Sequence, residues 1–228
     1  MFVYKESVKL KIMRSADMAT VFRTALVILT AYLIIAKFSA IAVVFLIAFT
    51  LFLDAFDGYL AVNEESKGKI SFISYLRAAS GNAEEAARVK GFKANISKHA
   101  PYGPRMDIAG DRVVEYVLWI VFTYLHTIPL FVLFIIVIRH SFVDAFMASK
   151  GTSSKMKTRF ARAVYSSNIG RGGINVVKFA TFSYLALMYI SGYPSIIGYI
   201  MTAILVSYVL LRGAAEVYET ITAPNLTK

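Results

Sequence analysis

Long apolar runs limit what this chain can fold into more than any other feature of its sequence. About six runs are long enough to cross a bilayer, whose hydrocarbon core needs about 20 apolar residues of helix; they cover residues 18–37, 38–61, 106–126, 128–147, 173–191 and 194–211. The hydrophobic fraction of 57% and the mean hydropathy of +0.60 agree with this pattern. The sequence therefore predicts an all-α integral membrane protein with six transmembrane helices, in one domain covering residues 1–228.

The breaks between these runs predict how the helices are connected. Short breaks predict three antiparallel hairpins, with turns at residues 36–40, 126–129 and 191–195. Two long polar connectors, at 62–105 and 148–172, join one hairpin to the next. Of the 25 lysines and arginines, Lys37 alone lies in a short turn, and the others lie in the termini, the connectors or helix ends on that same side.

This distribution of positive charge predicts the orientation of the chain. Because cytoplasmic loops carry the excess of lysine and arginine, we expect both termini and both connectors in the cytoplasm of a multi-pass protein of the cell membrane. The same orientation accounts for the net charge of +11, so no nucleic-acid partner is expected.

Five of the 14 acidic residues lie at matching depths on two of the predicted helices. Asp54 and Asp57 are three residues apart near the end of the second run. Asp107, Asp111 and Glu115 are spaced by four at the start of the third. Both spacings place side chains on one helix face, and a charge near the bilayer centre costs about 2.5–3.5 kcal/mol. We therefore expect one acidic pocket at the cytoplasmic ends of the second and third transmembrane helices, compensated by a metal, a basic partner or a water-filled cavity.

The ligands that this pocket offers are carboxylate oxygens, since the chain has no cysteine and the pocket has no histidine. Such ligands favour Mg²⁺ or Mn²⁺, and pairs of these ions commonly hold a phosphoryl group during its transfer. Small residues accompany the acids, namely Gly58, Ala61 and Gly103. They would allow a ligand or another backbone to come close, although helix packing alone also favours small residues.

Together these positions form a motif in two blocks, Asp54-x-x-Asp57-Gly58-x-x-Ala61 and Gly103-x-x-x-Asp107-x-x-x-Asp111. The pattern resembles the signature of the CDP-alcohol phosphatidyltransferases, D-x2-D-G-x2-A-R followed by G-x3-D-x3-D. Residues 16–24 are also similar to a family segment before the first helix, with Thr20 and Arg23 matching and Asp17 in place of an asparagine. The resemblance covers the first three helices well and the others by topology.

The resemblance implies a membrane enzyme that transfers a phosphatidyl-type group from a CDP-activated lipid to a small polar alcohol and releases CMP. In such enzymes the first three aspartates, here Asp54, Asp57 and Asp107, hold divalent metal on the donor pyrophosphate. The last, Asp111, also contacts metal and acts as general base on the acceptor hydroxyl. The family's small residues, here Gly58, Ala61 and Gly103, let the nucleotide approach the backbone. The resemblance further implies a homodimer working among membrane lipids.

One departure from the motif is the residue after Ala61. The family has an arginine there and this chain has Val62, so a contact to the pyrophosphate is missing or supplied elsewhere. Arg105, two residues before Asp107, is our candidate nucleotide-binding substitute, and a charge that sets topology at the interface is the alternative.

The second departure is the spacer between the two blocks, which has 41 residues (62–102) and is much longer than the family's. We expect residues 63–102 to form a cytosolic insertion. Asn82 predicts the start of a short helix over 82–92, and 70–76 is expected along the membrane surface. The insertion could cover the site, contact a partner or merely elaborate the surface.

The acceptor is less constrained than the donor. Arg139, Arg171 and Lys178 are candidates for binding an acceptor phosphate, such as that of inositol phosphate or glycerol phosphate, and a helix-end anchor is the alternative for each. Arg171 is the best candidate for binding an acceptor phosphate, because it lies in a glycine-rich turn near a helix start. We expect Glu115 to support the site through a pair with Arg23 or a residue of the fifth helix, because Arg112 is too near in sequence to share its face.

Two other classes of function stay open. The aspartates could line the path of a small cation transporter or channel, because acids inside a membrane often mark ion pathways. The acids cluster at one end of two helices, however, and the other helices show no polar residues at matching depth. A non-catalytic lipid-binding relative is the other alternative, and the retention of all four aspartates argues against it.

Overall fold

The computed structural model describes residues 14–99, 103–150, 158, 161, 164 and 168–222, and in this part of the chain all regular secondary structure is helical. The helices are α1 (Ser15–Ile35), α2 (Ala40–Glu65), α3 (Phe72–Ala79), α4 (Ala83–His99), α5 (Gly103–Tyr124), α6 (Leu130–Lys150), α8 (Asn168–Ser191) and α9 (Ser195–Thr222). The predicted all-α fold is confirmed.

Four helices are long and apolar enough to cross a membrane: α1, α2, the part of α8 from Gly173 onward, and α9. Length and composition therefore indicate an integral membrane protein, as the sequence predicts. Helix α5 does not qualify because it carries five charged side chains (Arg105, Asp107, Asp111, Arg112 and Glu115), and the described side chains of α6 end at Phe146. On this criterion the structure supports four of the six predicted spans.

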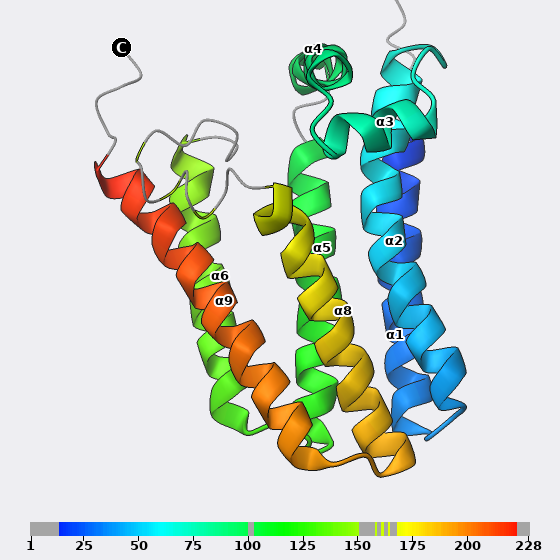
Figure 1. Cartoon of the computed structure of the whole chain (residues 1–228), viewed down its shortest axis with the longest axis vertical. Helices are drawn as coiled ribbons and strands as arrows, with labels where there is room; N and C mark the ends of the chain where they lie inside the picture. Colours follow the sequence, from blue (N-terminus) through cyan, green and yellow to red (C-terminus); the bar gives the residue numbers. More distant parts are fainter. Residues whose placement is uncertain are drawn as a thin grey trace, which may run out of the picture.

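The six long helices form three antiparallel hairpins, α1–α2, α5–α6 and α8–α9, whose tight turns lie at one end of the bundle (Figure 1). Helices α3 and α4 lie at the other end, where α1 and α5 begin (Figure 1). Each tight turn holds a residue with positive φ: Lys37 (50°), His126 (55°) and Gly192 (70°). A left-handed residue is a common way to end a helix, so these positions stop α1, α5 and α8 where the sequence predicts a turn.

The interior of the bundle is packed by branched and aromatic side chains from all six long helices. Phe182 of α8 lies edge-on to Trp119, with ring centroids 5.0 Å apart, and stacks on Phe122 of α5 at 6.1 Å. All three side chains are almost fully buried. Between helices in a membrane such van der Waals packing, rather than exclusion of water, supplies the attraction.

Helices α3 and α4 make up most of the predicted insertion. Helix α4 begins at Ala83, where the Asn82 side chain accepts a hydrogen bond from the Glu85 backbone N–H at 3.0 Å, so the predicted cap is confirmed. Helix α2 continues three residues beyond the predicted start of the insertion, to Glu65. A small core of its own, made of Val62, Ile70 and Val89, fastens the insertion to α2.

Helix α9 is longer than its apolar run, which ends at residue 211, whereas the helix continues to Thr222. Charged residues interrupt the apolar pattern there, but they are accommodated inside the bundle. Glu216 forms an ion pair with Arg139 of α6 at 3.3 Å, and Glu219 accepts hydrogen bonds from Thr158. The predicted span ends too early because hydropathy counts each charged residue as polar, whether or not it has a partner inside the bundle.

Candidate functional site

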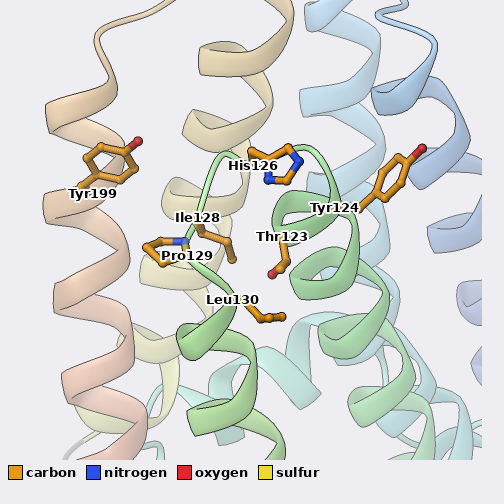
Figure 2. Close-up of a pocket in the computed structure, with 7 residues that line it drawn as sticks. All are labelled: Thr123, Tyr124, His126, Ile128, Pro129, Leu130 and Tyr199. Atoms are coloured by element: carbon orange, nitrogen blue, oxygen red, sulfur yellow. The ribbon is translucent and has the colours of Figure 1, made fainter.

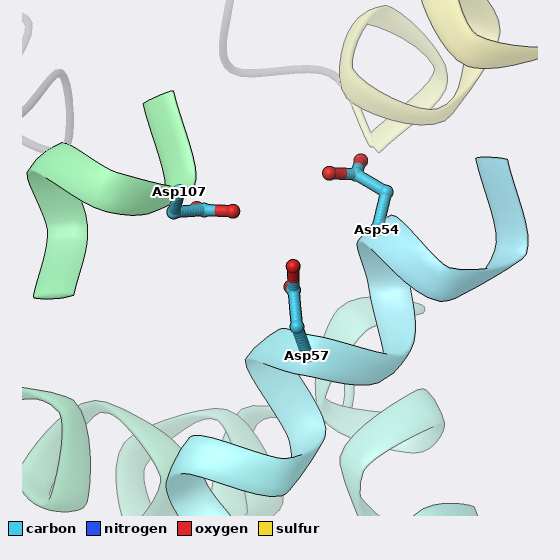
Figure 3. Close-up of side chains that lie close together, drawn as sticks. All are labelled: Asp54, Asp57 and Asp107. Carbon is cyan, nitrogen blue, oxygen red and sulfur yellow. The ribbon is translucent and has the colours of Figure 1, made fainter. Parts of the chain in front are cut away.

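Four aspartates from α2 and α5 meet beneath α3 and α4. One carboxylate oxygen from each of Asp54, Asp57 and Asp107 lies within 4.8 Å of the others. Figure 3 shows these side chains pointing from α2 and α5 toward a common space. The fourth, Asp111, lies one turn further along α5 and joins them through a shared partner.

That partner is Arg23 of α1, whose side chain is 2% exposed. Its Nη1 atom forms ion pairs with Asp54 and, at 2.8 Å, with Asp111. Its Nη2 atom lies 3.7 Å from Asp57 and 3.8 Å from Asp107. We call these five residues the acidic cluster. Four carboxylates and one guanidinium leave it with a formal charge of −3.

Our sequence analysis missed that Arg23 contacts all four aspartates. It treats Arg23 as a motif match and as a partner for Glu115. A signal was present, because an arginine within an apolar run needs an acidic partner. Thr20, one turn earlier on α1, donates a hydrogen bond to Asp57 at 3.2 Å. Helix α1 therefore positions the carboxylates that α2 and α5 present.

Gly110 of α5 allows α1 to come this close. A Cβ atom at this position would lie 2.4 Å from the Thr20 methyl group and 2.9 Å from Arg23 Nη2. Even alanine would therefore push α1 and its arginine away from α5. Sequence spacing did not single out Gly110, because its role depends on a helix that is distant in the chain.

The acidic cluster suits a hard divalent cation. Its ligands are all oxygens, and a formal charge of −3 remains after Arg23 offsets one of the four carboxylates. Within the described part of the chain, Arg23 Nε and Nη2 are buried without a hydrogen-bond partner. The carboxylates nearest Nη2, those of Asp57 and Asp107, are therefore not bound tightly to the arginine and keep oxygens available for a metal.

The residues that we expect to bind nucleotide lie at different distances from this cluster. Gly58 follows Asp57 on α2, and Ala61 lies one turn further along, half-buried. Gly103 is the first residue of α5, and nothing in the structure tests its predicted role. Arg105 is exposed, and among the described residues it forms no ion pair with the four aspartates. Its role as a substitute for the motif arginine stays a prediction.

A second group of charges lies next to the acidic cluster, further from α1. Glu115 forms an ion pair with Lys178 at 2.6 Å and a hydrogen bond with His140 at 3.0 Å, and it lies 3.6 Å from Arg112. Arg112 in turn binds Asp144 with two hydrogen bonds of 2.7 Å. We call the charge-balanced network the set Arg112, Glu115, Arg139, His140, Asp144, Lys178 and Glu216, from α5, α6, α8 and α9.

This network tests our expectations for Glu115. Its partner is a residue of the fifth long helix, Lys178 of α8, as one of the two alternatives predicted, and it is not Arg23. Excluding Arg112 was wrong, because residues three apart on a helix are neighbours on its surface. Of the three predicted acceptor-binding cations, two already have acidic partners. Lys178 and Arg139 are engaged by Glu115 and Glu216, whereas the side chain of Arg171, in α8, lies outside the described residues.

A small cavity of about 30 Å³ separates the two groups of charges. The residues that line it come from α1, α2, α5 and α8 and include Asp54, Asp111, Glu115, Asn175 and Lys178. A larger hollow of about 460 Å³ lies at the opposite end of the bundle, around the α5–α6 turn and Tyr199 (Figure 2). Because no carboxylate lines the larger hollow, the small cavity is the one that belongs to the acidic chemistry.

We compared the chain with known proteins and found no match. No protein-family model, curated protein or solved structure matches this chain. The likeness to the CDP-alcohol phosphatidyltransferases therefore stands on the motif positions themselves, and what it implies for function is a proposal.

Proposed function

We propose that this protein transfers a phosphatidyl-type group from a CDP-activated lipid to a small polar alcohol, releasing CMP. The observation that carries the proposal is the meeting of Asp54, Asp57, Asp107 and Asp111 around one buried arginine, at the spacing of the family motif. Such a cluster, with its negative charge only partly neutralised, is the arrangement that a metal-dependent phosphoryl transfer requires. Mg²⁺ or Mn²⁺, held by the four aspartates, would neutralise the leaving CMP and polarise the attacked phosphorus.

The four aspartates differ in exposure, and the difference supports different roles. The Asp57 side chain is 5% exposed and that of Asp54 is 25% exposed, so both suit a fixed ligand. Asp111 is 39% exposed and lines the small cavity, where an acceptor hydroxyl could reach it. We assign Asp111 as the general base. It takes the hydroxyl proton as the acceptor oxygen bonds to the donor phosphorus and the bond from that phosphorus to CMP breaks.

Arg23 has a positioning role in this scheme. Its guanidinium joins α2 to α5, because a single nitrogen, Nη1, contacts both Asp54 and Asp111. A charge fixed in this way costs no reorganisation when the phosphoryl group is transferred. Arg23 therefore keeps the four carboxylates in place before substrates arrive.

The acceptor hydroxyl would reach Asp111 beside Asn175 and Lys178 of α8, which line the small cavity, and the cavity of about 30 Å³ would have to widen to admit the acceptor. Lys178 is already paired with Glu115, so its positive charge is shared there. This pairing favours a neutral polar alcohol at Lys178. A phosphate-bearing acceptor such as inositol phosphate or glycerol phosphate would depend more on Arg171 and Arg139, our other candidates.

The membrane arrangement follows the same proposal. We propose that α5 and α6 also span the bilayer, since they form a hairpin of the same length beside the four qualifying helices. Their charged residues pair inside the bundle, which makes such residues tolerable in a membrane. The end that carries α3, α4 and the acidic cluster would face the cytoplasm, and a homodimer is expected from the family resemblance.

Transport of a cation is less well supported than transfer. A path leading from the acidic cluster through the small cavity would pass Arg23 and Lys178, and both would repel the cation. No observation on the described residues favours a path in another direction.

The test is CMP release from CDP-diacylglycerol or its dialkyl analogue by the purified protein with Mn²⁺ or Mg²⁺. The acceptor panel is inositol, inositol phosphate, glycerol, glycerol phosphate and serine. Acceptor-dependent release that Asp111→Asn abolishes, with donor binding retained, is the expected result. Donor binding that is absent from wild type with either metal would overturn the proposal.

A further inference from the structure

Val62 stands where the resembled family has an arginine, and the structure explains the exchange. Its side chain is fully buried and packs against Ile70 and Val89 of the insertion. An arginine in this small apolar core would have no acidic partner within it, and burying an unpaired charge is costly. The packing of the insertion against α2 therefore requires an apolar residue at position 62, where the family has its arginine.

The insertion also places a tyrosine over the acidic end of α2. A Cβ atom at Gly58 would lie 2.7 Å from the Tyr75 hydroxyl, so the tyrosine occupies the space that the glycine leaves open. Aromatic contacts hold α3 in this position: Tyr59 of α2 lies 5.2 Å from the Phe72 ring and 5.9 Å from the Tyr75 ring, measured between centroids. Gly58, next to Asp57, therefore makes room for a side chain of the insertion.

Lys93 of α4 lies on the outer side of the same tyrosine. Its Nζ atom is 3.4 Å from the Tyr75 hydroxyl and 5.4 Å from the ring centroid. Lys93 is exposed and is close enough to Asp107 to interact with it electrostatically. A lysine and a tyrosine hydroxyl thus stand together at the mouth of the acidic cluster, on elements that the family motif does not contain.

We propose that Tyr75 and Lys93 of the insertion bind the diphosphate of a nucleoside-diphosphate donor, in place of the arginine that Val62 replaces. The inference rests on the proposed function and deepens it. The lysine supplies the positive charge, and the tyrosine supplies a second donor and holds the lysine over the site. A hydrogen bond from a charged group to a phosphate oxygen is among the stronger polar contacts in proteins.

The test uses the full-length protein in detergent with Mn²⁺, and CDP and CMP as soluble probes titrated by calorimetry. Lys93→Gln should weaken CDP binding by about tenfold, because one charge-assisted contact is lost. CMP, which lacks the second phosphate, should lose less. Lys93→Arg should keep most of the affinity, and Tyr75→Phe, which keeps the ring and removes the hydroxyl, should lose less than Lys93→Gln.

Two controls separate this role from damage to the fold. Lys90→Gln makes the same change in charge one turn earlier on α4, at an exposed lysine, and should leave CDP affinity unchanged. Mn²⁺ binding, followed by electron paramagnetic resonance, should be no weaker in Lys93→Gln, because a nearby positive charge has been removed.

The outcomes distinguish this inference from the proposed function. Wild-type binding of CDP with no loss in Lys93→Gln would overturn the role of Lys93 and leave the proposed function standing. Equal losses of CDP and CMP, or the same loss in Lys90→Gln, would also overturn it. If Arg105→Gln alone weakens CDP, Arg105 is the substitute. Wild-type protein that binds no CDP with Mn²⁺ or Mg²⁺ would overturn both.

Discussion

The acidic cluster and the charge-balanced network share helix α5 but differ in their total charge. The cluster sets four carboxylates against one arginine, whereas the network sets Glu115, Asp144 and Glu216 against Arg112, Arg139 and Lys178. The opposite charges of the network therefore offset one another inside the bundle. The formal charge of −3 is left unbalanced within the cluster, and carboxylates that share one site repel one another. The comparison separates charges that are balanced between helices from carboxylates that would be balanced by the metal of the proposed function.

The largest expected effect is on function, at Asp54. Asp54→Asn should lower CMP release by at least about a hundredfold, because even groups that only support a metal ligand contribute tenfold to a hundredfold. Mn²⁺ affinity should fall together with activity. The matched change in the network, Asp144→Asn, should leave Mn²⁺ affinity unchanged, and an equal loss of Mn²⁺ binding in both variants would erase the distinction between the two groups.

Next is the stability of the acidic cluster, tested at Arg23. Removing one partner of a buried ion pair costs about 3–5 kcal/mol, so Arg23→Gln should unfold at a clearly lower temperature. Because the variant leaves four carboxylates without their arginine, Mn²⁺ should raise its melting temperature more than that of wild type. Thermal unfolding in detergent, with and without Mn²⁺, measures both effects. A smaller response to Mn²⁺ than in wild type would contradict a cation site here.

Thermal unfolding of a variant in the charge-balanced network should respond differently to Mn²⁺. Glu115→Gln leaves Lys178 and Arg112 without their shared acid and should also lower the melting temperature, by somewhat less because glutamine keeps a hydrogen-bonding oxygen. Mn²⁺ should raise the melting temperature of this variant no more than that of wild type. Recovery with Mn²⁺ comparable to that of Arg23→Gln would mean that the network, too, takes part in binding metal.

The smallest effects are expected at two glycines that each make room for an arginine. A Cβ atom at Gly110 would lie 2.9 Å from Arg23 Nη2, and one at Gly213 would lie 2.7 Å from Arg139 Nε. Overpacking of this kind typically costs about 1–3 kcal/mol, so Gly110→Ala and Gly213→Ala should destabilise to a similar degree. Mn²⁺ affinity should change in Gly110→Ala alone, and calorimetric titration of both variants would show whether it does.

Sequence reasoning predicted the local features well because they depend on neighbours in the chain. The Asn82 cap, the three tight turns and the acidic faces of α2 and α5 follow from residue type at a helix start, from breaks in apolar runs and from spacings of three and four. Arg23 and Gly110 were missed because their roles arise where α1 crosses α5, some 90 residues apart in the sequence. The contact of Glu115 with Lys178 and the cover that Tyr75 forms over Gly58 also depend on distant segments, whereas the exclusion of Arg112 was a local error.

The position of the insertion has a consequence for how such a site can change during evolution. The two blocks of the motif are separated by 41 residues, yet α2 and α5 present their aspartates to one space. The entropy of closing a loop rises only with the logarithm of its length, so each doubling costs about 0.6 kcal/mol. Selection can therefore lengthen this connection almost freely without separating the carboxylates. A segment that is at first only a tolerated extension can then evolve side chains that contact the substrate.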